Sequence, residues 1–269
     1  MANQELDEDE INPFTMLLTN DQDHTLNSFA TVHDESTPNQ QDLHILRSIQ
    51  STVVIRQLRS EGLSFQLWPA ATALVTLLDL HRIDPSKSPL STTLSAARAG
   101  ANNRPLRILE LGSGTGIVGI VAAATLGCHV TITDLPHVVQ NLQFNADANK
   151  EGVGSTGGAV KVASLRWGHA DDVDKIGREF DIILASDVVY HDHLYDPLLE
   201  TLRMMMLVSG DGKERKKMVF VMAHLRRWKK ESSFFKKAKK LFEVDVLHRD
   251  SPCDGSRVGV IIYRFVGKV

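Results

Sequence analysis

A glycine-rich turn between an apolar run and a helical segment constrains the fold of this chain more than any other feature. Residues 107–111 (RILEL) form a short apolar run that predicts a buried strand, and residues 115–126 predict a helix of small and branched side chains. Gly112, Gly114 and Gly116 lie between the two, where glycine allows a tight turn and the close approach of a ligand to the backbone. In open α/β sheets, ligands bind at such turns, at the carboxyl ends of parallel strands. The turn therefore predicts a binding site as well as a fold class.

The rest of the chain continues the alternation of strands and helices. Pro69 opens a helix that we expect to run to about residue 80, since proline is tolerated at the first helical position. Residues 46–57 are rich in β-branched side chains and predict one or two strands, whereas residues 84–104 are expected to form a loop or a short insertion. Downstream, strands are predicted at residues 130–134, 160–164, 180–185 and 218–223, and helices at residues 138–149, 195–208 and 228–241.

Two final strands are expected at residues 244–247 and 258–265, with only a loop around Pro252 between them. They predict a hairpin in which the last strand runs antiparallel to its neighbours. Strands that alternate with helices form βαβ units. The pattern therefore predicts an α/β fold with a mostly parallel sheet.

The composition is that of an ordinary globular protein. Apolar residues make up 42% of the 269 residues and charged residues 23%, which excludes a wholly disordered or collagen-like chain. No uninterrupted apolar run approaches the roughly 18–20 residues that cross a bilayer, and the first ten residues (MANQELDEDE) carry no apolar signal segment. Cys128 and Cys253 are too few for a disulfide scaffold or a cysteine-built metal site. We therefore expect no membrane association and a reducing compartment, the cytoplasm, with access to the nucleus left open.

The formal net charge of −3 conceals two segments of opposite charge. Residues 1–45 hold ten Asp and Glu and no Lys or Arg, and residues 213–240 hold twelve Lys and Arg against two Glu. We expect residues 1–42 to form an acidic, flexible tail and residues 43–269 to form the folded domain. Four interpretations of the basic segment are open: a solvated outer helix face, a docking surface for an acidic protein partner, a contact with nucleic acid, or pairing with the acidic tail of the same chain.

Two cofactors are compatible with the glycine-rich turn as a pattern. Gly114, Gly116 and Gly119 satisfy a dinucleotide-binding fingerprint, and Asp134 ends the next predicted strand, where a carboxylate can accept both hydroxyls of a ribose. On the other interpretation, Glu110 lies at the mouth of the site beside the glycines, where its charge would repel a pyrophosphate. A carboxylate at that place suits a cationic ligand without phosphate, such as S-adenosylmethionine.

Five segments in a fixed order carry a resemblance to a known family. They are residues 67–71 (LWPAA), 109–119 (LELGSGTGIVG), 130–135 (VTITDL), 165–168 (LRWG) and 184–190 (LASDVVY). Through them the chain resembles the class I S-adenosylmethionine-dependent methyltransferases and, within these, the protein-lysine methyltransferases related to the valosin-containing-protein and Hsp70 lysine methyltransferases (the methyltransferase-like 21 type). The resemblance runs from about Leu43 to the C-terminus. It implies a Rossmann-like α/β fold, a seven-stranded mostly parallel sheet with helices on both faces and an antiparallel last strand.

The resemblance also assigns roles to residues of these segments. Trp68 resembles the residue that closes over the methionine end of the cofactor, Asp134 the ribose carboxylate, and Trp167 the residue that stacks on adenine. Ser186 occupies a position where relatives often have alanine, and its backbone is expected to touch the cofactor. The implied cofactor is S-adenosyl-L-methionine, and its expected contacts are Trp68, Glu110, Gly112, Gly114, Gly116, Asp134, Trp167 and Ser186.

Asp187 and Tyr190 match an acidic-x-x-aromatic motif after the fourth parallel strand, where the resemblance places the acceptor amine. A lysine amine has an ordinary pKa of about 10.4, so about one in 10³ is neutral near pH 7. We expect Asp187 to orient the ammonium and to carry a hydrogen bond as the proton leaves, and Tyr190 to supply an aromatic wall for a cation–π contact. The implied activity is methyl transfer to a lysine side chain of a protein substrate.

Other functions stay open at the level of the sequence. They are methyl transfer to a protein histidine, a small amine or RNA, and a binding scaffold without catalysis. The Asp187-x-x-Tyr190 motif differs from the Asn/Asp-Pro-Pro-aromatic motif of base amino-methyltransferases, which makes a nucleic-acid acceptor the weaker expectation. His191 and His193 lack a patterned third ligand, so no metal site is expected.

Two further groups of side chains are assigned to structure rather than to catalysis. Residues 204–206 (MMM) and 234–235 (FF) are expected to fill core positions on helices. Asn141, Asn145 and Asn149 recur every four residues along one side of a helix, and we expect them to form polar packing contacts at helix ends.

Overall fold

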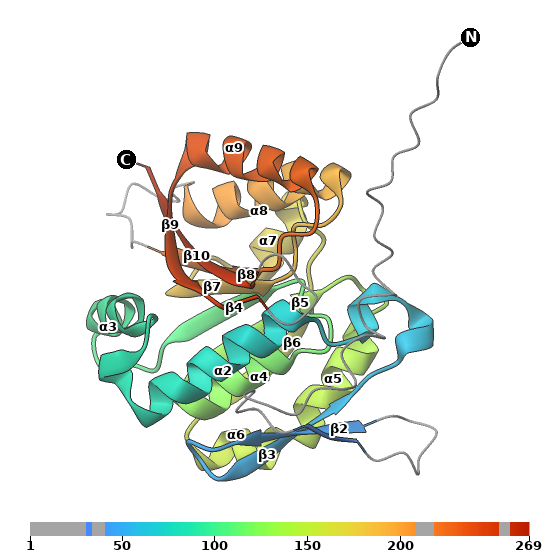
Figure 1. The fold of residues 1–269 in the computed structure, drawn as a ribbon, viewed down its shortest axis with the longest axis vertical. Helices are drawn as coiled ribbons and strands as arrows, with labels where there is room; N and C mark the ends of the chain where they lie inside the picture. The colour runs from blue at the N-terminus through green and yellow to red at the C-terminus, as the bar shows by residue number, and fades with distance from the viewer. Residues whose placement is uncertain (1–30, 34–40, 208–217, 253–258, 269) are drawn as a thin grey trace.

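The computed structural model describes residues 31–33, 41–207, 218–252 and 259–268, and a seven-stranded sheet lies at its centre (Figure 1). The strands are β4 (Arg107–Leu111), β5 (His129–Asp134), β6 (Ala159–Ser164), β7 (Ile182–Ser186), β8 (Val219–His224), β9 (Phe242–Arg249) and β10 (Ile261–Gly267). They lie in the order β6-β5-β4-β7-β8-β10-β9. β10 pairs antiparallel with both β8 and β9, and the other neighbouring strands pair in parallel. The predicted sheet and its reversed last strand are confirmed.

Helices cover both faces of the sheet, as expected (Figure 1). The first face carries α2 (Pro69–Ile83), α3 (Ser91–Gly100), α4 (Ile117–Leu126), α5 (Val139–Ala148) and α6 (Lys150–Ser155). The second face carries α7 (Ala170–Ile176), α8 (Tyr195–Met206) and α9 (Ser232–Leu241). Strand side chains alternate between the two, so Ile108 joins the core of the first face and Leu109 that of the second. Each face therefore has its own apolar core.

The order of the strands creates a switch point beside β4. The chain runs from β4 outward to β5 and β6, then crosses back to β7 on the other side of β4. The connections after neighbouring strands separate at such a point and leave a crevice at their carboxyl ends, where ligands bind in open α/β sheets. The glycine-rich turn follows β4 directly, so the fold places it in this crevice.

Three segments differ from the sequence expectations. Residues 84–104, expected to be a loop, contain the ten-residue helix α3, because Leu90 and Leu94 lie four residues apart and bury together in the core. Helix α7 was not expected, since a seven-residue helix is too short to show a clear hydrophobic period. Helix α9 begins at Ser232 rather than at residue 228, after a short 3₁₀ turn.

The predicted core positions on α8 and α9 are confirmed. Met204, Met205 and Met206 are buried, and Phe234 is completely buried. Phe235 is partly buried and packs against the same apolar cluster. The aromatic pair of the basic segment is therefore part of the core of the second face.

A second sheet of three strands lies beside α5 and α6 (Figure 1). It contains β1 (Thr31–His33), β2 (Gln41–Leu46) and β3 (Ser51–Arg56) in that order. β1 and the start of β2 fall within the segment expected to be a tail, most of which lies outside the described residues, as do residues 213–217 of the basic segment. The division into a tail of residues 1–42 and a domain of residues 43–269 stays a prediction.

Two asparagines of α5 and the asparagine directly after it hold β3 in place. Asn149 accepts a hydrogen bond from the Val54 N–H and donates one to the Val54 carbonyl, both at 2.8 Å. Asn145 pairs with the Arg56 N–H at 2.8 Å and the Arg56 carbonyl at 3.2 Å, and Asn141 accepts from Arg56 Nε at 2.7 Å. The helix thus takes the place of a neighbouring strand for alternate residues of β3. We expected polar packing from these side chains, and the structure shows a hydrogen-bonded ladder along the helix.

Asn145→Ala should lower the free energy of unfolding by about 2–4 kcal/mol, because it leaves the Arg56 N–H and the Thr115 carbonyl without their buried partner. Urea unfolding followed by circular dichroism measures this loss. Gln143→Ala is the matched control on the exposed side of the same helix, where Gln143 bonds only to Asp147 among the described residues. Its expected effect is within about 0.5 kcal/mol. Equal losses in the two variants would contradict the role of the ladder.

One described segment, Leu63–Ile83, is long and apolar enough to cross a membrane by length and composition, with a mean hydropathy of 1.3. Half of it is buried inside the fold. Its helical part, α2, buries Leu74 and Leu78 in the core of the first face. These are the features of a core helix.

Candidate cofactor and acceptor site

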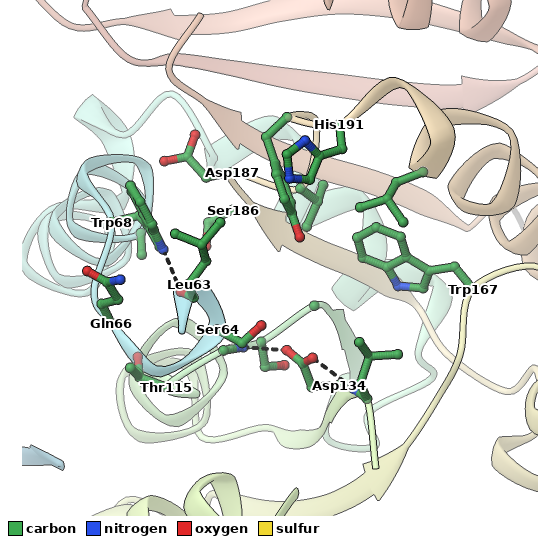
Figure 2. A pocket seen from close by; sticks show the side chains of 18 of the residues that line it. Leu63, Ser64, Gln66, Trp68, Thr115, Asp134, Trp167, Ser186, Asp187 and His191 are labelled. Carbon is green, nitrogen blue, oxygen red and sulfur yellow. Dashed lines mark hydrogen bonds between the residues drawn. The ribbon is translucent and has the colours of Figure 1, made fainter. Parts of the chain in front are cut away.

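A cavity of about 450 Å³ opens at the carboxyl ends of the parallel strands, at the switch point (Figure 2). Its walls come from the loops after β4, β5, β6, β7 and β8 and from the segment before α2. Figure 2 shows Trp68 and Asp187 on one side of it and Trp167 on the opposite side. A cavity of this size can hold a cofactor-sized ligand. Of the predicted site residues, its lining contains Trp68, Gly112, Gly114, Asp134, Trp167, Ser186, Asp187 and Tyr190.

Two glycines of the turn keep the cavity open. Gly112 and Gly114 line it with φ angles of +61° and +56°, in the left-handed region that other side chains rarely adopt. A Cβ atom on Gly112 would lie 2.8 Å from the Trp167 ring and 3.0 Å from Val188. Glycine at this position therefore preserves the space between the turn and Trp167.

The other glycines of the turn serve packing. Gly116 does not line the cavity, and a Cβ atom there would lie 2.6 Å from Leu142 of α5. A Cβ atom on Gly119 would collide with Ile132 of β5 and lie 2.6 Å from Glu110 Oε2. The third glycine of the dinucleotide fingerprint is thus explained by the close contact of α4 with the sheet. Gly116 was predicted to contact the cofactor, but the structure places it outside the lining of the cavity.

Asp134 both organises the turn and faces the cavity. Its Oδ2 accepts a hydrogen bond from the Gly114 N–H and its Oδ1 accepts one from the Leu135 N–H, each at 2.8 Å. Burial raises the pKa of Asp134. Each carboxylate oxygen has a further lone pair for a donor, so the side chain can accept the hydroxyls of a ribose.

Glu110 lies beneath the turn rather than at the mouth of the site. It shares the side of β4 with Ile108, so it points under α4 and is completely buried outside the cavity lining. Its Oε2 accepts from the Gly119 N–H at 3.0 Å, and among the described residues its Oε1 has no partner. Burial raises the pKa of Glu110 to about 8, and the nearby charge of Asp134 adds to the increase. The carboxyl group therefore keeps its proton at neutral pH.

Glu110→Gln should stabilise the protein at alkaline pH. The pKa of Glu110 is about 8 in the folded protein and 4.5 ordinarily, so the unfolded chain loses this proton first. The stability that the wild type has below pH 4.5 therefore falls as the pH rises to 8, by about 4–5 kcal/mol in all. Glutamine does not titrate. Urea unfolding at pH 4 and pH 9 should show similar free energies at pH 4 and a more stable variant at pH 9, whereas parallel curves would contradict a buried, protonated Glu110.

The segment before α2 closes one side of the cavity and is anchored by the small sheet. The Trp68 indole N–H donates to the Leu63 carbonyl at 2.9 Å, as Figure 2 shows. The Leu67 N–H donates to Gln57 Oε1 at 2.6 Å, and Gln57 in turn donates to Asp42 of β2. Gln57 and Asp42 are both buried. The position of Trp68 therefore depends on β2 and β3 as well as on its own segment.

The opposite side carries Trp167 on the loop after β6. Asp172 of α7 accepts three hydrogen bonds from Arg166, from the backbone N–H at 3.1 Å, Nε at 2.7 Å and Nη2 at 3.0 Å. These bonds hold the pKa of Asp172 well below its usual range. On the other side of Trp167, the Gly168 N–H donates to Thr201 Oγ1 at 2.8 Å. The loop is thus fixed on both sides of the indole.

Asp187 follows β7 and is held by a partner that we did not predict. Its φ angle is +52°, a strained value for a side chain that is not glycine. Its Oδ2 accepts from Arg227 Nη2 at 3.0 Å, and its Oδ1 accepts from Arg227 Nη1 at 3.2 Å and from the Leu225 N–H at 3.1 Å. Both charged side chains line the cavity, although Asp187 is only 4% exposed and Arg227 only 10%. Asp187 is therefore already part of an ion pair.

His224 and Glu231 support this ion pair from inside the protein. Glu231 Oε2 accepts from the backbone N–H of Arg227 at 3.1 Å and lies 3.1 Å from His224 Nε2. His224 Nδ1 lies 4.0 Å from Asp187 Oδ1. His224 and Glu231 are completely buried. Glu231 therefore helps to hold the backbone of Arg227, the residue that pairs with Asp187.

Arg227 is the site residue that sequence reasoning missed. It stands in the run RRWKK, and its neighbours Arg226, Lys229 and Lys230 are exposed in the way expected of a solvated basic segment. The signal that could have found it is its place three residues after the end of β8, at the carboxyl edge of the sheet. Trp228 lines the cavity beside it and was missed for the same reason.

Tyr190 lines the cavity beside His191, with 4.8 Å between the two ring centroids. Burial raises the pKa of Tyr190, so its phenol is neutral at physiological pH. The rings of His191 and His193 stack with their centroids 5.4 Å apart. In the described part of the chain, no group of three or more His, Cys, Asp or Glu is placed to hold a metal ion.

The residues around the cavity fit S-adenosylmethionine better than a dinucleotide. Asp134 offers acceptors for a ribose, and Gly112 leaves space beside the flat ring of Trp167. A site that binds a pyrophosphate usually offers it cationic side chains that are not already paired. The two arginines of the lining are both engaged, Arg166 with an aspartate of α7 and Arg227 with the aspartate after β7.

Comparisons with known proteins give the family. A family model described as lysine methyltransferase matches residues 48–241. Protein N-lysine methyltransferase METTL21A of Danio rerio is 32% identical over 206 residues, 76% of this chain and 78% of that protein. EEF1A lysine methyltransferase 3 of Mus musculus is 29% identical over 204 residues, 76% of this chain and 72% of that protein. Protein-lysine N-methyltransferase rrg1 of Schizosaccharomyces pombe is 33% identical over 165 residues, 59% of this chain and about half, 48%, of that protein.

The matched region contains the whole cavity. Its lining residues fall between Leu63 and Trp228, inside the span of residues 48–241. The methyl donor of such an enzyme is S-adenosylmethionine, which the geometry of the turn, Asp134 and Trp167 accommodates. The chain belongs to the lysine methyltransferase family.

Proposed function

We propose that this chain transfers a methyl group from S-adenosylmethionine to the side-chain amine of a lysine in a protein substrate. One observation carries the proposal: a single cavity joins a cofactor end, with Asp134 and Trp167, to an acceptor end, with Asp187 and Tyr190. The names of the relatives, which describe protein-lysine methyltransferases, support the same acceptor.

The protein promotes this reaction mainly by positioning the acceptor nitrogen and the methyl carbon. When bound, S-adenosylmethionine supplies a methyl carbon made electrophilic by its sulfonium. The ammonium of the substrate first loses a proton to water. The neutral nitrogen then bonds to the methyl carbon, and the carbon–sulfur bond breaks with its electron pair on sulfur, which leaves methyl-lysine and S-adenosylhomocysteine. Holding nitrogen and carbon near 3–3.5 Å in line accounts for a large share of the rate.

The side chains of the cavity divide this work. Asp134 binds the ribose, and Trp167 stacks on the adenine. Trp68 closes over the methionine end of the cofactor, and Tyr190 forms an aromatic wall that excludes water and contacts the acceptor side chain through a cation–π interaction. Asp187 accepts a hydrogen bond from the acceptor nitrogen and fixes the direction of its lone pair.

The exposed basic residues beside the cavity favour an acidic stretch of the protein substrate. Arg226, Lys229 and Lys230 are exposed next to Arg227 and Trp228, which line the cavity. Within the described residues, none of these three exposed cations forms an ion pair with an acidic side chain. Such a surface attracts negative charge around a target lysine. We place the reaction in the cytoplasm, because a chain with two cysteines suits a reducing compartment.

Incubation with radiolabelled S-adenosylmethionine and a cell extract, with and without nuclease, tests the proposed function. We expect label on protein lysine, located by mass spectrometry, in equal amounts in both samples. Label that disappears with nuclease and is found on no lysine would identify RNA as the acceptor and overturn the proposal. Label on histidine alone would mean that the protein is a methyltransferase but that its acceptor is histidine rather than lysine.

A further inference from the structure

The guanidinium of Arg227 occupies most of the hydrogen-bonding capacity of Asp187. An ionised carboxylate has about four acceptor sites. Arg227 takes two of them, at 3.0 and 3.2 Å, and the Leu225 N–H takes a third at 3.1 Å. One acceptor site is left, on Oδ2, for a donor in the cavity. The charge of the carboxylate is at the same time neutralised by the guanidinium.

A carboxylate without this partner would oppose methyl transfer. An opposite charge within about 4–6 Å of an amine stabilises the ammonium and raises its pKa by 1–3 units. The lysine pKa is already about 10.4, and only the neutral amine can attack the methyl carbon. Asp187 alone would therefore hold the substrate in the unreactive form. Paired with Arg227, it still accepts a hydrogen bond but adds no net negative charge.

We propose that Arg227 is a positioning residue for methyl transfer, which neutralises Asp187 so that the acceptor lysine loses its proton, while one lone pair of Asp187 stays free to orient the amine. The inference rests on the proposed function. The guanidinium is held in place on three sides: by Asp187, by the Trp68 ring, whose centroid lies 5.3 Å from Arg227 Cζ, and by the Leu225 carbonyl, which accepts from Nη1 at 3.2 Å.

Other titratable groups surround the pair of Asp187 and Arg227, and the wild type and the variants described below all contain them. His224 of β8 and Glu231 of the turn before α9 lie behind it. Tyr190 and His191 from the loop after β7, and Asp134 from β5, line the same cavity. A difference between the pH profiles of wild type and variant therefore reports the change at position 227.

Arg227→Met is the variant of choice, because methionine keeps a long unbranched side chain and removes the charge. The assay follows initial rates of methyl-lysine formation from pH 6.5 to pH 10, with nuclease-treated cell extract as the acceptor and the extract alone as background. We expect the midpoint of the profile to rise by at least about one pH unit, so that the rate at pH 7 falls about 10-fold or more and recovers at high pH. Arg227→Lys keeps the positive charge, so its midpoint should lie close to that of the wild type.

Arg226→Met is the matched control. Arg226 is the exposed neighbour, and its guanidinium donates to Ser232 Oγ at 2.9 Å rather than to Asp187. Because Arg226 belongs to the exposed basic surface, its loss should lower the rate by the same factor at every pH and leave the midpoint of the wild-type profile unchanged. An unshifted midpoint for Arg227→Met, or a rate reduced equally at every pH together with weakened S-adenosylhomocysteine binding in calorimetry, would overturn the inference and leave the proposed function standing. A wild type that forms no methyl-lysine at any pH would overturn both.

Discussion

Asp187→Asn should reduce methyl transfer by about 10²–10⁴-fold and leave cofactor affinity nearly unchanged. Asparagine tolerates the φ of +52° at this position, so the backbone of the loop is kept. The amide has one oxygen and one NH₂ group, so it cannot keep both bonds to the Arg227 guanidinium and also accept from the substrate amine. Steady-state rates with radiolabelled cofactor measure the loss, and isothermal titration with S-adenosylhomocysteine measures the affinity.

Alanine at position 187 gives a less direct test, because it leaves Arg227, which is 10% exposed, without its counter-ion. Asp187→Asn combined with Arg227→Met removes both charges and should fold, yet stay as inactive as Asp187→Asn alone. Loss of cofactor binding in step with activity would mean that Asp187 belongs to the cofactor end of the cavity, against the role assigned to it.

Asp134→Ala should weaken S-adenosylhomocysteine binding by at least about 100-fold. The carboxylate offers two charge-assisted hydrogen bonds to a ribose, each worth about 1.5–3 kcal/mol. It also accepts from the Gly114 and Leu135 N–H groups, so the glycine turn loses its anchor as well. Calorimetric titration measures the affinity directly.

Asp171→Ala is the matched control for Asp134→Ala. Asp171 is an exposed aspartate in the first turn of α7 and does not line the cavity. Its removal changes the net charge by the same amount and should leave the affinity within about two-fold of the wild type. Similar losses in the two variants would mean that net charge, rather than the ribose contact, governs binding.

The features predicted best from the sequence are those encoded within a few residues. The glycine turn, Asp134 at the end of a strand and Asp187 after another strand each depend on a local pattern, and the structure brings all three to one cavity. The central strands β4, β7 and β8 follow from equally short patterns, since each is a near-continuous apolar run, as expected of a strand buried on both faces.

The features that were missed depend on contacts between distant segments. Forty residues separate Asp187 from Arg227, and 95 separate Val54 from Asn149. No local pattern distinguishes an arginine that pairs with a buried aspartate from one that points into water. Glu110 is a different case, because a local pattern decides its direction: its residue type suited a cationic ligand, but its side of β4 directs it under α4. Strand parity could have predicted that direction.

Lysine methylation in this cavity is tested by locating the methyl groups that the protein transfers. Wild type and Asp187→Asn are incubated in parallel with trideuteromethyl-labelled S-adenosylmethionine and nuclease-treated cell extract, and tandem mass spectrometry locates the labelled methyl groups. We expect trideuteromethyl groups on lysine side chains with the wild type and a loss of nearly all of them with Asp187→Asn. Labelled methyl groups on other residues only, or equal lysine labelling by the two proteins, would contradict this expectation.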